Sequence, residues 1–256
     1  MCGYFGSRTF CFIGKNEIIM KKTNHIIKTI LHPIMLLGVK LIDCSKVTII
    51  GKNPIDNLTE SAIFVVNHTN GHDFPVAAQV IKKHFYILAD FTMKKDFIVN
   101  TLNRLNGCVY VDRKNPTSKK QSKEKLIKHL KCGNNVLLFP EGTWNLHPSR
   151  LLLPLNWGAV DLSLKTGKPI IPIVLLYRDK SVYVKIGTPF KSTQDKTVEI
   201  LSLEEQMSTL LWDLMMQFES QKRADLPTDY KEKYIKEQLD TYKKFNLEYE
   251  TSVIRK

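Results

Sequence analysis

The stretch AIFVVNHTNGHDFPVAA (residues 62–78) decides the fold, because it predicts a strand, a tight turn and a helix in direct succession. Its first six residues form a largely β-branched, apolar run of the kind found in strands that are buried on both faces of a sheet. Asp73 is expected to be the N-cap of the following helix, with Pro75 in its first turn. Gly71 favours the tight turn, since glycine adopts backbone conformations that other residues avoid.

The same alternation of strand and helix continues along most of the chain. Short runs rich in β-branched and aromatic residues predict strands at 47–51, 62–67, 85–89, 108–112, 136–139, 170–176 and 182–187. Helical stretches fall between many of them, at 74–83, 94–105, 118–131 and 156–166, and helix returns from about 203. For a chain of 256 residues, this pattern predicts one α/β domain with a mainly parallel central sheet that is covered by helices.

The N-terminal region differs from the rest. The run IIKTILHPIMLLGVKLI (26–42) is apolar, but it contains lysines and a proline and is shorter than the roughly 20 apolar residues of a spanning helix. It predicts either a buried packing helix or, as we prefer, a helical segment in the membrane interface. We divide the chain into an N-terminal extension with this membrane-associating segment (1–45), an α/β domain (46–200) and a C-terminal helical tail (201–256).

The first 19 residues lack the charged and apolar regions of a secretory signal. They precede Met20-Lys21-Lys22, which resembles a start, so we interpret them as an extension that need not be native. The five cysteines show no paired spacing, which favours reduced thiols in a cytosolic setting. Together with the apolar run, this places the protein, as an expectation, on the cytoplasmic face of a membrane, peripheral or monotopic.

The net charge of +13 points to an anionic partner, such as a membrane surface, a nucleic acid or a phosphorylated substrate. The charge is concentrated between residues 82 and 131, where 13 basic residues face 4 acidic ones, a local excess of +9. Six of these lysines crowd residues 119–131, which is equally consistent with a solvated helix face. Since no nucleic-acid-reading motif is present, we expect a lipid surface and no nucleic acid.

His68 and Asp73 are predicted to lie at the two ends of the tight turn, at the carboxyl end of a buried strand. Ligands and catalytic groups gather at this edge of open α/β sheets. A carboxylate that accepts a hydrogen bond from one ring nitrogen of His68 leaves the other nitrogen as a proton acceptor, which is the base half of a catalytic triad. For this motif alone, the simpler interpretation is that Asp73 caps the helix and His68 packs.

His68 and His72 could instead ligate a metal ion. The zinc pattern H-E-x-x-H requires a glutamate after the first histidine, where this sequence has Thr69. Gly71 also disfavours a helix through the pair. We therefore expect no metal site here.

Three further motifs follow in order: GCVYVDR (107–113), FPEGTWN (139–145) and IIPIV (170–174). With NHTNGHD (67–73), they resemble the pattern N-H-x4-D, G-x-x-x-[IV]-D-R, F-P-E-G-T-[RS], [IV]-[IV]-P-[IV] of the membrane-associated glycerolipid acyltransferases. This family is typified by 1-acyl-sn-glycerol-3-phosphate acyltransferase. Each motif is weak by itself, but four in order on alternating strands are a strong signal. Across the matched region, residues 67–174, the resemblance implies an enzyme of phospholipid biosynthesis.

The resemblance implies a role for each matching residue. His68 matches the general base and Asp73 the acid that orients it, whereas His72 falls at a variable position. Arg113 matches an arginine implicated in holding the acceptor's phosphate, a task that suits a guanidinium fork. Lys94 and Lys95 resemble a lysine pair of the family. Glu141 and Gly142 match the third motif, which shapes the acceptor site. Pro172 matches the fourth motif.

The implied reaction transfers a fatty acyl group from acyl-CoA or acyl-ACP to the hydroxyl of a lysophospholipid, most simply 1-acylglycerol-3-phosphate, giving phosphatidic acid. The expected partners are the membrane lipid surface, the lysophospholipid and the acyl-CoA or acyl carrier protein. No cofactor is implied beyond the acyl donor. A non-catalytic basic protein that binds lipid or nucleic acid is the less favoured alternative, since the His68 and Asp73 pair is intact.

One position departs from the family pattern. Many members have Arg after the Thr of the third motif, where this chain has Trp144. The change is either drift, with Arg113 and the lysine pair sufficient for a phosphate, or a sign that the acceptor is a glycolipid or amino-lipid. A tryptophan could stack on a sugar ring or line an acyl groove, and its N–H could bond a hydroxyl.

Overall fold

A seven-stranded sheet forms the centre of the part of the chain that the computed structural model describes. That part comprises residues 45–91, 107–147, 150–178, 180–193 and 195–218, with residues 32, 33 and 37. The strands are β1 (Lys46–Ile49), β2 (Ile63–Val66), β3 (Phe85–Asp90), β4 (Cys108–Val111), β5 (Asn135–Leu138), β6 (Ile170–Arg178) and β7 (Ser181–Ile186). Each lies on a run that the sequence predicted to be a strand, with ends that differ by a few residues.

The sheet is mixed but mostly parallel, in the order β1-β7-β6-β2-β5-β3-β4. β2 occupies the middle, where Phe64 is in register with Leu137 of β5 and Ile171 of β6. β6 and β7 pair in antiparallel fashion, and β1 runs parallel to β7 at the edge. All four residues of β2 are buried, as expected for a strand covered on both faces. The predicted fold class is thus confirmed.

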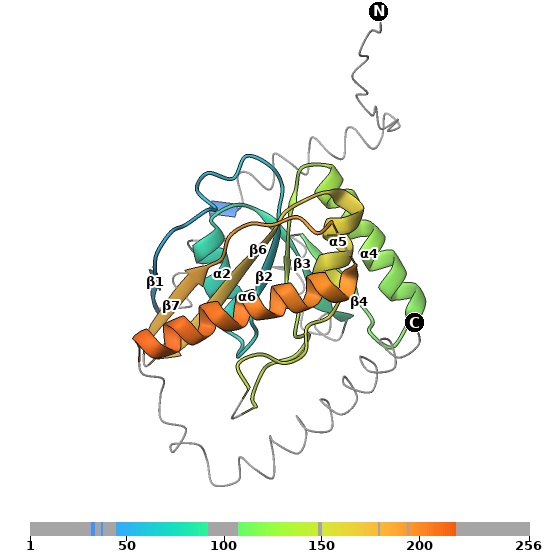
Figure 1. Cartoon of the computed structure of the whole chain (residues 1–256). Helices are drawn as coiled ribbons and strands as arrows, with labels where there is room; N and C mark the ends of the chain where they lie inside the picture. Colours follow the sequence, from blue (N-terminus) through green and yellow to red (C-terminus); the bar gives the residue numbers. More distant parts are fainter. Residues whose placement is uncertain are drawn as a thin grey trace, which may run out of the picture.

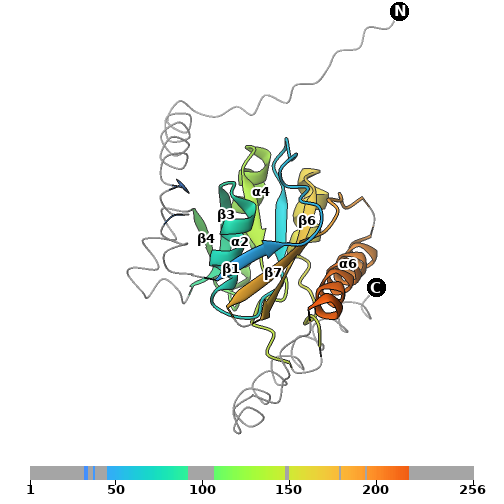
Figure 2. The same cartoon turned by 90° about the vertical axis from the view of Figure 1, so that its left-hand side faces the viewer.

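Helices cover both faces of this sheet. The described helices are α2 (Asp73–Ile81), α4 (Pro116–Lys131), α5 (Gly158–Thr166) and α6 (Lys196–Gln217). One apolar core joins the sheet to α4, α5 and α6, and a second joins its other face to α2. Figure 1 shows α6 crossing the sheet, and in Figure 2 α6 and α2 lie on opposite sides of it.

Two helices start differently from the prediction. The N-cap of α2 is His72, whose side chain makes no capping hydrogen bond, so the prediction that Asp73 is the N-cap was wrong by one residue. α6 begins at Lys196, where the Asp195 side chain accepts the Thr197 N–H, about two turns before the predicted start. α6 therefore runs across the proposed boundary between residues 200 and 201, and its buried residues pack into the core of the α/β domain.

Several predicted elements lie outside the described residues. These are the N-terminal helical segment, apart from the three residues named above, the helix at 94–105 and the chain beyond residue 218. Among the helices that the structure describes, none has the length and apolar character needed to cross a membrane. Parallel β2, β3, β4 and β5 bring their carboxyl ends to one edge of the sheet, which is where His68, Arg113 and Glu141 follow their strands.

Candidate active site

The strand that leads to His68 is held in place by Asn67. The Asn67 side chain donates from Nδ2 to the Leu175 carbonyl at 3.1 Å and accepts the Leu175 N–H at 2.7 Å. Both hydrogen bonds are buried and tie the end of β2 to β6. Because a buried amide with both ends satisfied rotates little, the next residue leaves the sheet in a defined direction.

Asp73 accepts the hydrogen bond that orients His68. The distance from His68 Nδ1 to Asp73 Oδ2 is 2.8 Å, and the Asp73 side chain is completely buried. The carboxylate also accepts the N–H groups of Thr69 and Asn70, the Thr69 hydroxyl and, at 2.8 Å, the Tyr177 hydroxyl. These donors hold the carboxylate inside the turn, so it faces His68 and does not cap the helix.

The imidazole of His68 lies in a partly open aromatic setting. Its ring stacks on Phe139 with centroids 4.1 Å apart, and the Trp144 ring meets it edge-on at 6.2 Å. About a fifth of the side chain is exposed to solvent. Because a carboxylate can only accept, the hydrogen bond to Asp73 assigns the proton to Nδ1, which leaves Nε2 as an acceptor. The geometry is therefore that of a general base.

Glu141 positions the main chain of His68. Its Oε1 accepts the His68 N–H at 2.7 Å, and its Oε2 accepts the Leu153 N–H at 2.8 Å. On the other side of His68, the carbonyl oxygen accepts the Asn145 N–H at 2.6 Å. The loop that follows β5 thus forms hydrogen bonds with both the N–H and the carbonyl group of His68. Glu141 shapes the site by fixing the main chain of His68.

Burial raises the pKa of Glu141 to about 8, although the N–H groups of Leu153 and His68 act in the opposite direction. The negative charge of Asp73 raises the same pKa further, while the Asn145 side chain lowers it. Desolvation dominates because the Glu141 side chain is almost fully buried. Near neutral pH, Glu141 is therefore mainly protonated.

Arg113 lies against the same loop. Its Nη1 donates to the Gly142 carbonyl, and its Nε lies 3.5 Å from Asp90 Oδ2. Nearly half of the Arg113 side chain is exposed, so the guanidinium is accessible to an anion at the edge of the site. Gly142 has a φ of +74°, and a Cβ there would lie 2.9 Å from both Arg113 Nη1 and Asn156 Nδ2. The positive φ favours glycine, and a Cβ would also require the ends of the Arg113 and Asn156 side chains to shift.

His72 lies away from the His68 and Asp73 pair. It is exposed just before α2, and its N–H donates to the Asn70 side chain. Among the described residues, no group of three or more His, Cys, Asp or Glu side chains could hold a metal ion. The arrangement that remains is a base, its orienting acid and an exposed cation, which together suit proton removal from the hydroxyl of an anionic substrate.

The sequence profile of the Acyltransferase family matches residues 46–176, which is just over half of the chain. The chain belongs to this family. The match begins at β1 and ends in β6, so it includes every strand that contributes to the site.

Curated relatives within the family are similar at modest identity. A 1-acyl-sn-glycerol-3-phosphate acyltransferase of Haemophilus influenzae is 28% identical over 114 residues, which cover 44% of this chain and 47% of the relative. One of Borreliella burgdorferi, with the same name, is 27% identical over 150 residues, covering 59% and 56%. The chain thus matches about half the length of these relatives.

A solved structure shows the same fold. The crystal structure of the 1-acyl-sn-glycerophosphate (LPA) acyltransferase PlsC from Thermotoga maritima superposes with a TM-score of 0.59 at 20% identity. The superposition covers 82% of this chain and 86% of that one. At this identity the likeness supports the architecture and leaves the substrate open.

The structure brings most of the family motifs together. The contacts given above link six of the predicted site residues: His68, Asp73, Arg113, Glu141, Gly142 and Trp144. Lys94 and Lys95 lie outside the described residues. Trp144 is 46% exposed at the rim of the site, and a Cβ on Gly71 would lie 3.9 Å from its ring. The residue that departs from the family pattern therefore lies beside the base.

Two site residues escaped the sequence reasoning. Tyr177 donates to Asp73 across 104 positions of sequence, and Asn67 bonds Leu175 across 108. Asn67 was visible as the N of the N-H-x4-D motif, but its partner was not. For Tyr177, a tyrosine at the end of an apolar strand in the same sheet was the only available signal.

Proposed function

We propose that the protein transfers a fatty acyl group from an acyl thioester to the hydroxyl of a lysophospholipid, with 1-acylglycerol-3-phosphate as the leading acceptor and phosphatidic acid as the product. The observation that carries the proposal is the 2.8 Å hydrogen bond between His68 Nδ1 and the buried Asp73 carboxylate. Family membership and the names of the curated relatives point to the same reaction.

His68 acts as the general base in the proposed mechanism. Nε2 takes the proton of the acceptor hydroxyl as its oxygen attacks the thioester carbonyl carbon, and Asp73 stabilises the imidazolium that forms. The tetrahedral oxyanion then collapses, the carbon–sulfur bond breaks, and the departing thiolate takes the proton from Nε2. The chemistry requires no group beyond the two substrates, because a thiolate leaves readily.

Arg113 is the residue proposed to hold the acceptor's phosphate. It is the exposed cation at the rim of the site, and a guanidinium can donate two parallel hydrogen bonds to phosphate oxygens. Its contact with the Gly142 carbonyl fixes one end of the fork. Lys94 and Lys95 are retained as proposed phosphate contacts on the basis of the family pattern.

The direct test measures acyl transfer by the purified full chain. Labelled acyl-CoA and acyl-ACP are each offered with lysophosphatidate and with other lysophospholipids. We expect transfer to lysophosphatidate and a loss of at least a hundredfold in His68→Ala, in line with the usual contribution of a general base. His72→Ala is the matched control and should retain wild-type activity. Activity that survives His68→Ala but not His72→Ala would refute the assignment.

A different acceptor is the second candidate, and the position of Trp144 favours it. The exposed indole lies beside the base, where an arginine in many members could contact a phosphate. An indole offers a flat apolar face and one N–H donor, which suit a sugar ring or a hydroxyl better than a phosphate. Competition between lysophosphatidate and glycolipid or amino-lipid acceptors distinguishes the two candidates.

Trp144→Arg sharpens that comparison. If the tryptophan sets acceptor choice, the variant should gain activity on lysophosphatidate and lose activity on the other acceptor. If lysophosphatidate is strongly preferred by the wild-type chain and Trp144→Arg changes little, the second candidate is excluded.

We also propose that the protein works at the cytoplasmic surface of a membrane, where residues 20–45 dock the domain and the basic residues between 82 and 131 attract anionic lipid. The apolar run at 26–42 and the local charge of +9 support this. Vesicle flotation should show salt-sensitive binding by the full chain and weaker binding by a chain that lacks residues 1–45. Equal flotation of both at low and high salt would contradict the proposal.

A further inference from the structure

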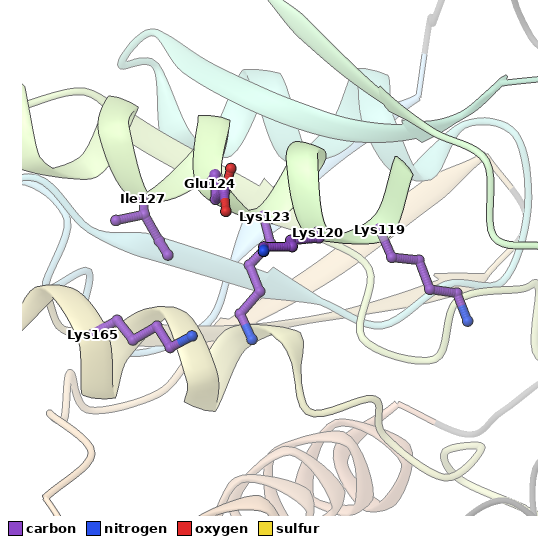
Figure 3. Close-up of a pocket in the computed structure, with 6 residues that line it drawn as sticks. All are labelled: Lys119, Lys120, Lys123, Glu124, Ile127 and Lys165. Carbon is purple, nitrogen blue, oxygen red and sulfur yellow. The ribbon is translucent and has the colours of Figure 1, made fainter. Parts of the chain in front are cut away.

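A lysine-lined pocket lies between α4 and α5, outside the candidate active site. Its volume is about 340 Å³, and it is lined by Lys119, Lys120, Lys123, Glu124 and Ile127 of α4 and by Lys165 of α5. In Figure 3, Lys123 reaches from α4 toward α5, and Lys165 extends along α5 toward the same space. Part of the lysine cluster that the sequence left open as a solvated helix face is therefore gathered around a concavity.

The pocket carries positive charge that its own carboxylates do not balance. The lining side chains comprise four lysines and one glutamate, a net charge of +3. Asp161 lies behind the pocket, but it already pairs with both Lys123 and Lys196. Burial, Lys165 and Lys196 lower the pKa of Lys123 to about 8 in spite of that ion pair. Such crowding costs free energy that a bound anion would recover.

The pocket lies in the helical layer of α4, α5 and α6, on the face of the sheet opposite to α2. Lys119 is in the first turn of α4, which follows Arg113 along the chain, whereas Lys165 is in the last turn of α5. From Lys119 to Ile127, the helix rises roughly 12 Å. One end of the pocket is therefore close in sequence to Arg113, the arginine at the rim of the site.

We propose that this pocket is a second binding site, specific for the phosphate groups of a substrate or lipid. Lysine ammonium groups bind phosphate as mobile point charges, and several around one concavity can follow a flexible polyanion such as a nucleotide bisphosphate. A source that follows from the proposed function is the nucleotide end of a CoA thioester, whose long pantetheine arm separates its phosphates from the reacting carbonyl. The headgroups of anionic phospholipids offer the same chemistry.

The test measures binding by the full chain without any acyl transfer. Adenosine 3′,5′-bisphosphate is titrated calorimetrically in one arm, and phosphatidylcholine vesicles with and without phosphatidic acid are used in the other. Lys119→Ala/Lys120→Ala removes two exposed pocket lysines. Lys125→Ala/Lys131→Ala is the matched control, because it removes two exposed lysines of the same helix that do not line the pocket.

We expect the pocket variant to bind the bisphosphate at least tenfold more weakly than the wild type, and the control variant to stay within twofold of it. In the vesicle arm, both lysine pairs belong to the basic residues between 82 and 131, so both variants should weaken binding. There we expect the pocket variant to bind at least fivefold more weakly than the control variant. Selective loss in the nucleotide arm supports the site and assigns its phosphate to the donor, and selective loss in the vesicle arm supports the site and assigns it to lipid. Equal binding by the two variants in both arms overturns the proposal.

Because no turnover is involved, the result stands apart from the proposed function. A wild-type chain that binds the bisphosphate through the pocket but transfers no acyl group would refute the function and leave the site intact. A chain that transfers acyl groups, but whose pocket and control variants bind equally well in both arms, would support the proposed function and refute the pocket as a binding site.

Discussion

Glu141→Gln tests the claim that a buried, mainly neutral glutamate supports the peptide of His68. The pKa of Glu141 is about 8 in the folded chain and has its ordinary value near 4.5 in the unfolded chain. As the pH rises from 4.5 to 8, the folded chain therefore keeps a proton that the unfolded chain has lost. The resulting contribution to stability is fully present below pH 4.5 and is lost as the pH rises toward 8. Glutamine does not titrate, so stability of the variant lacks this dependence.

The size of the effect follows from the two pKa values. Between pH 4.5 and 8, the free energy of unfolding of the wild type should fall relative to that of Glu141→Gln by about 1.4 kcal/mol per pH unit, or at most about 5 kcal/mol in all. At pH 5, protonated Glu141 still has lone pairs on both oxygens, which lie against the N–H groups of His68 and Leu153. Glutamine offers one acceptor oxygen and turns its NH2 toward the other N–H. We therefore expect Glu141→Gln to be less stable than the wild type there by about 1–3 kcal/mol, the cost of one buried N–H without an acceptor.

Urea unfolding followed by tryptophan fluorescence at pH 5, 6, 7 and 8 measures this difference, since other titrating groups cancel between the two proteins. Glu205→Gln is the matched control, because Glu205 is exposed on α6 and its variant should run parallel to the wild type. A difference between wild type and Glu141→Gln that stays constant across this range, or changes with the opposite sign, would refute the reasoning.

Two further substitutions probe the contacts around the base. Tyr177→Phe removes the hydroxyl that donates to Asp73 at 2.8 Å. In steady-state assays we expect kcat to fall about fivefold, equivalent to roughly 1 kcal/mol, and KM to stay unchanged. A change in KM alone would exclude a role of Tyr177 in positioning Asp73. Gly142→Ala places a Cβ 2.9 Å from Arg113 and Asn156 at a residue whose φ is +74°. Urea unfolding should show that the free energy of unfolding falls by about 1–2 kcal/mol. An unchanged unfolding midpoint would show that alanine is tolerated at this φ.

The strands were predictable because their residues are mainly apolar, β-branched or aromatic, whether burial is continuous, as in β2, or alternates, as in β7. β2 is buried on both faces, and the pattern of its residues permits little else. The start of α6 was missed because the apolar residues after 203 give the stronger helical signal, although Asp195 is a residue type that favours the N-cap. The order of the strands has no such local signature, since it depends on which faces pack together.

The motif residues of the candidate site were predictable from the sequence, but the hydrogen bonds that fix their orientation were not. The spacing of His68 and Asp73 was sufficient to place acid and base in one turn. The spacing did not reveal that the Asp73 carboxylate accepts hydrogen bonds within the turn instead of capping the helix, nor that the Tyr177 hydroxyl from a distant strand donates to it as well. Glu141 was identified by resemblance alone, and its contact with the His68 N–H emerged only once β5 lay beside β2.

The long-range hydrogen bonds around His68 and Asp73 also set the earliest time at which the proposed base and acid can be fully assembled during synthesis. The ribosome adds residues at about 5–20 per second, so Tyr177 is made roughly 5–20 s after Asp73. Until then the nascent chain contains the turn but neither the strand that pins Asn67 nor the hydroxyl that holds the acid. The hydrogen bonds that hold the pair are therefore complete only when the sixth strand has been made.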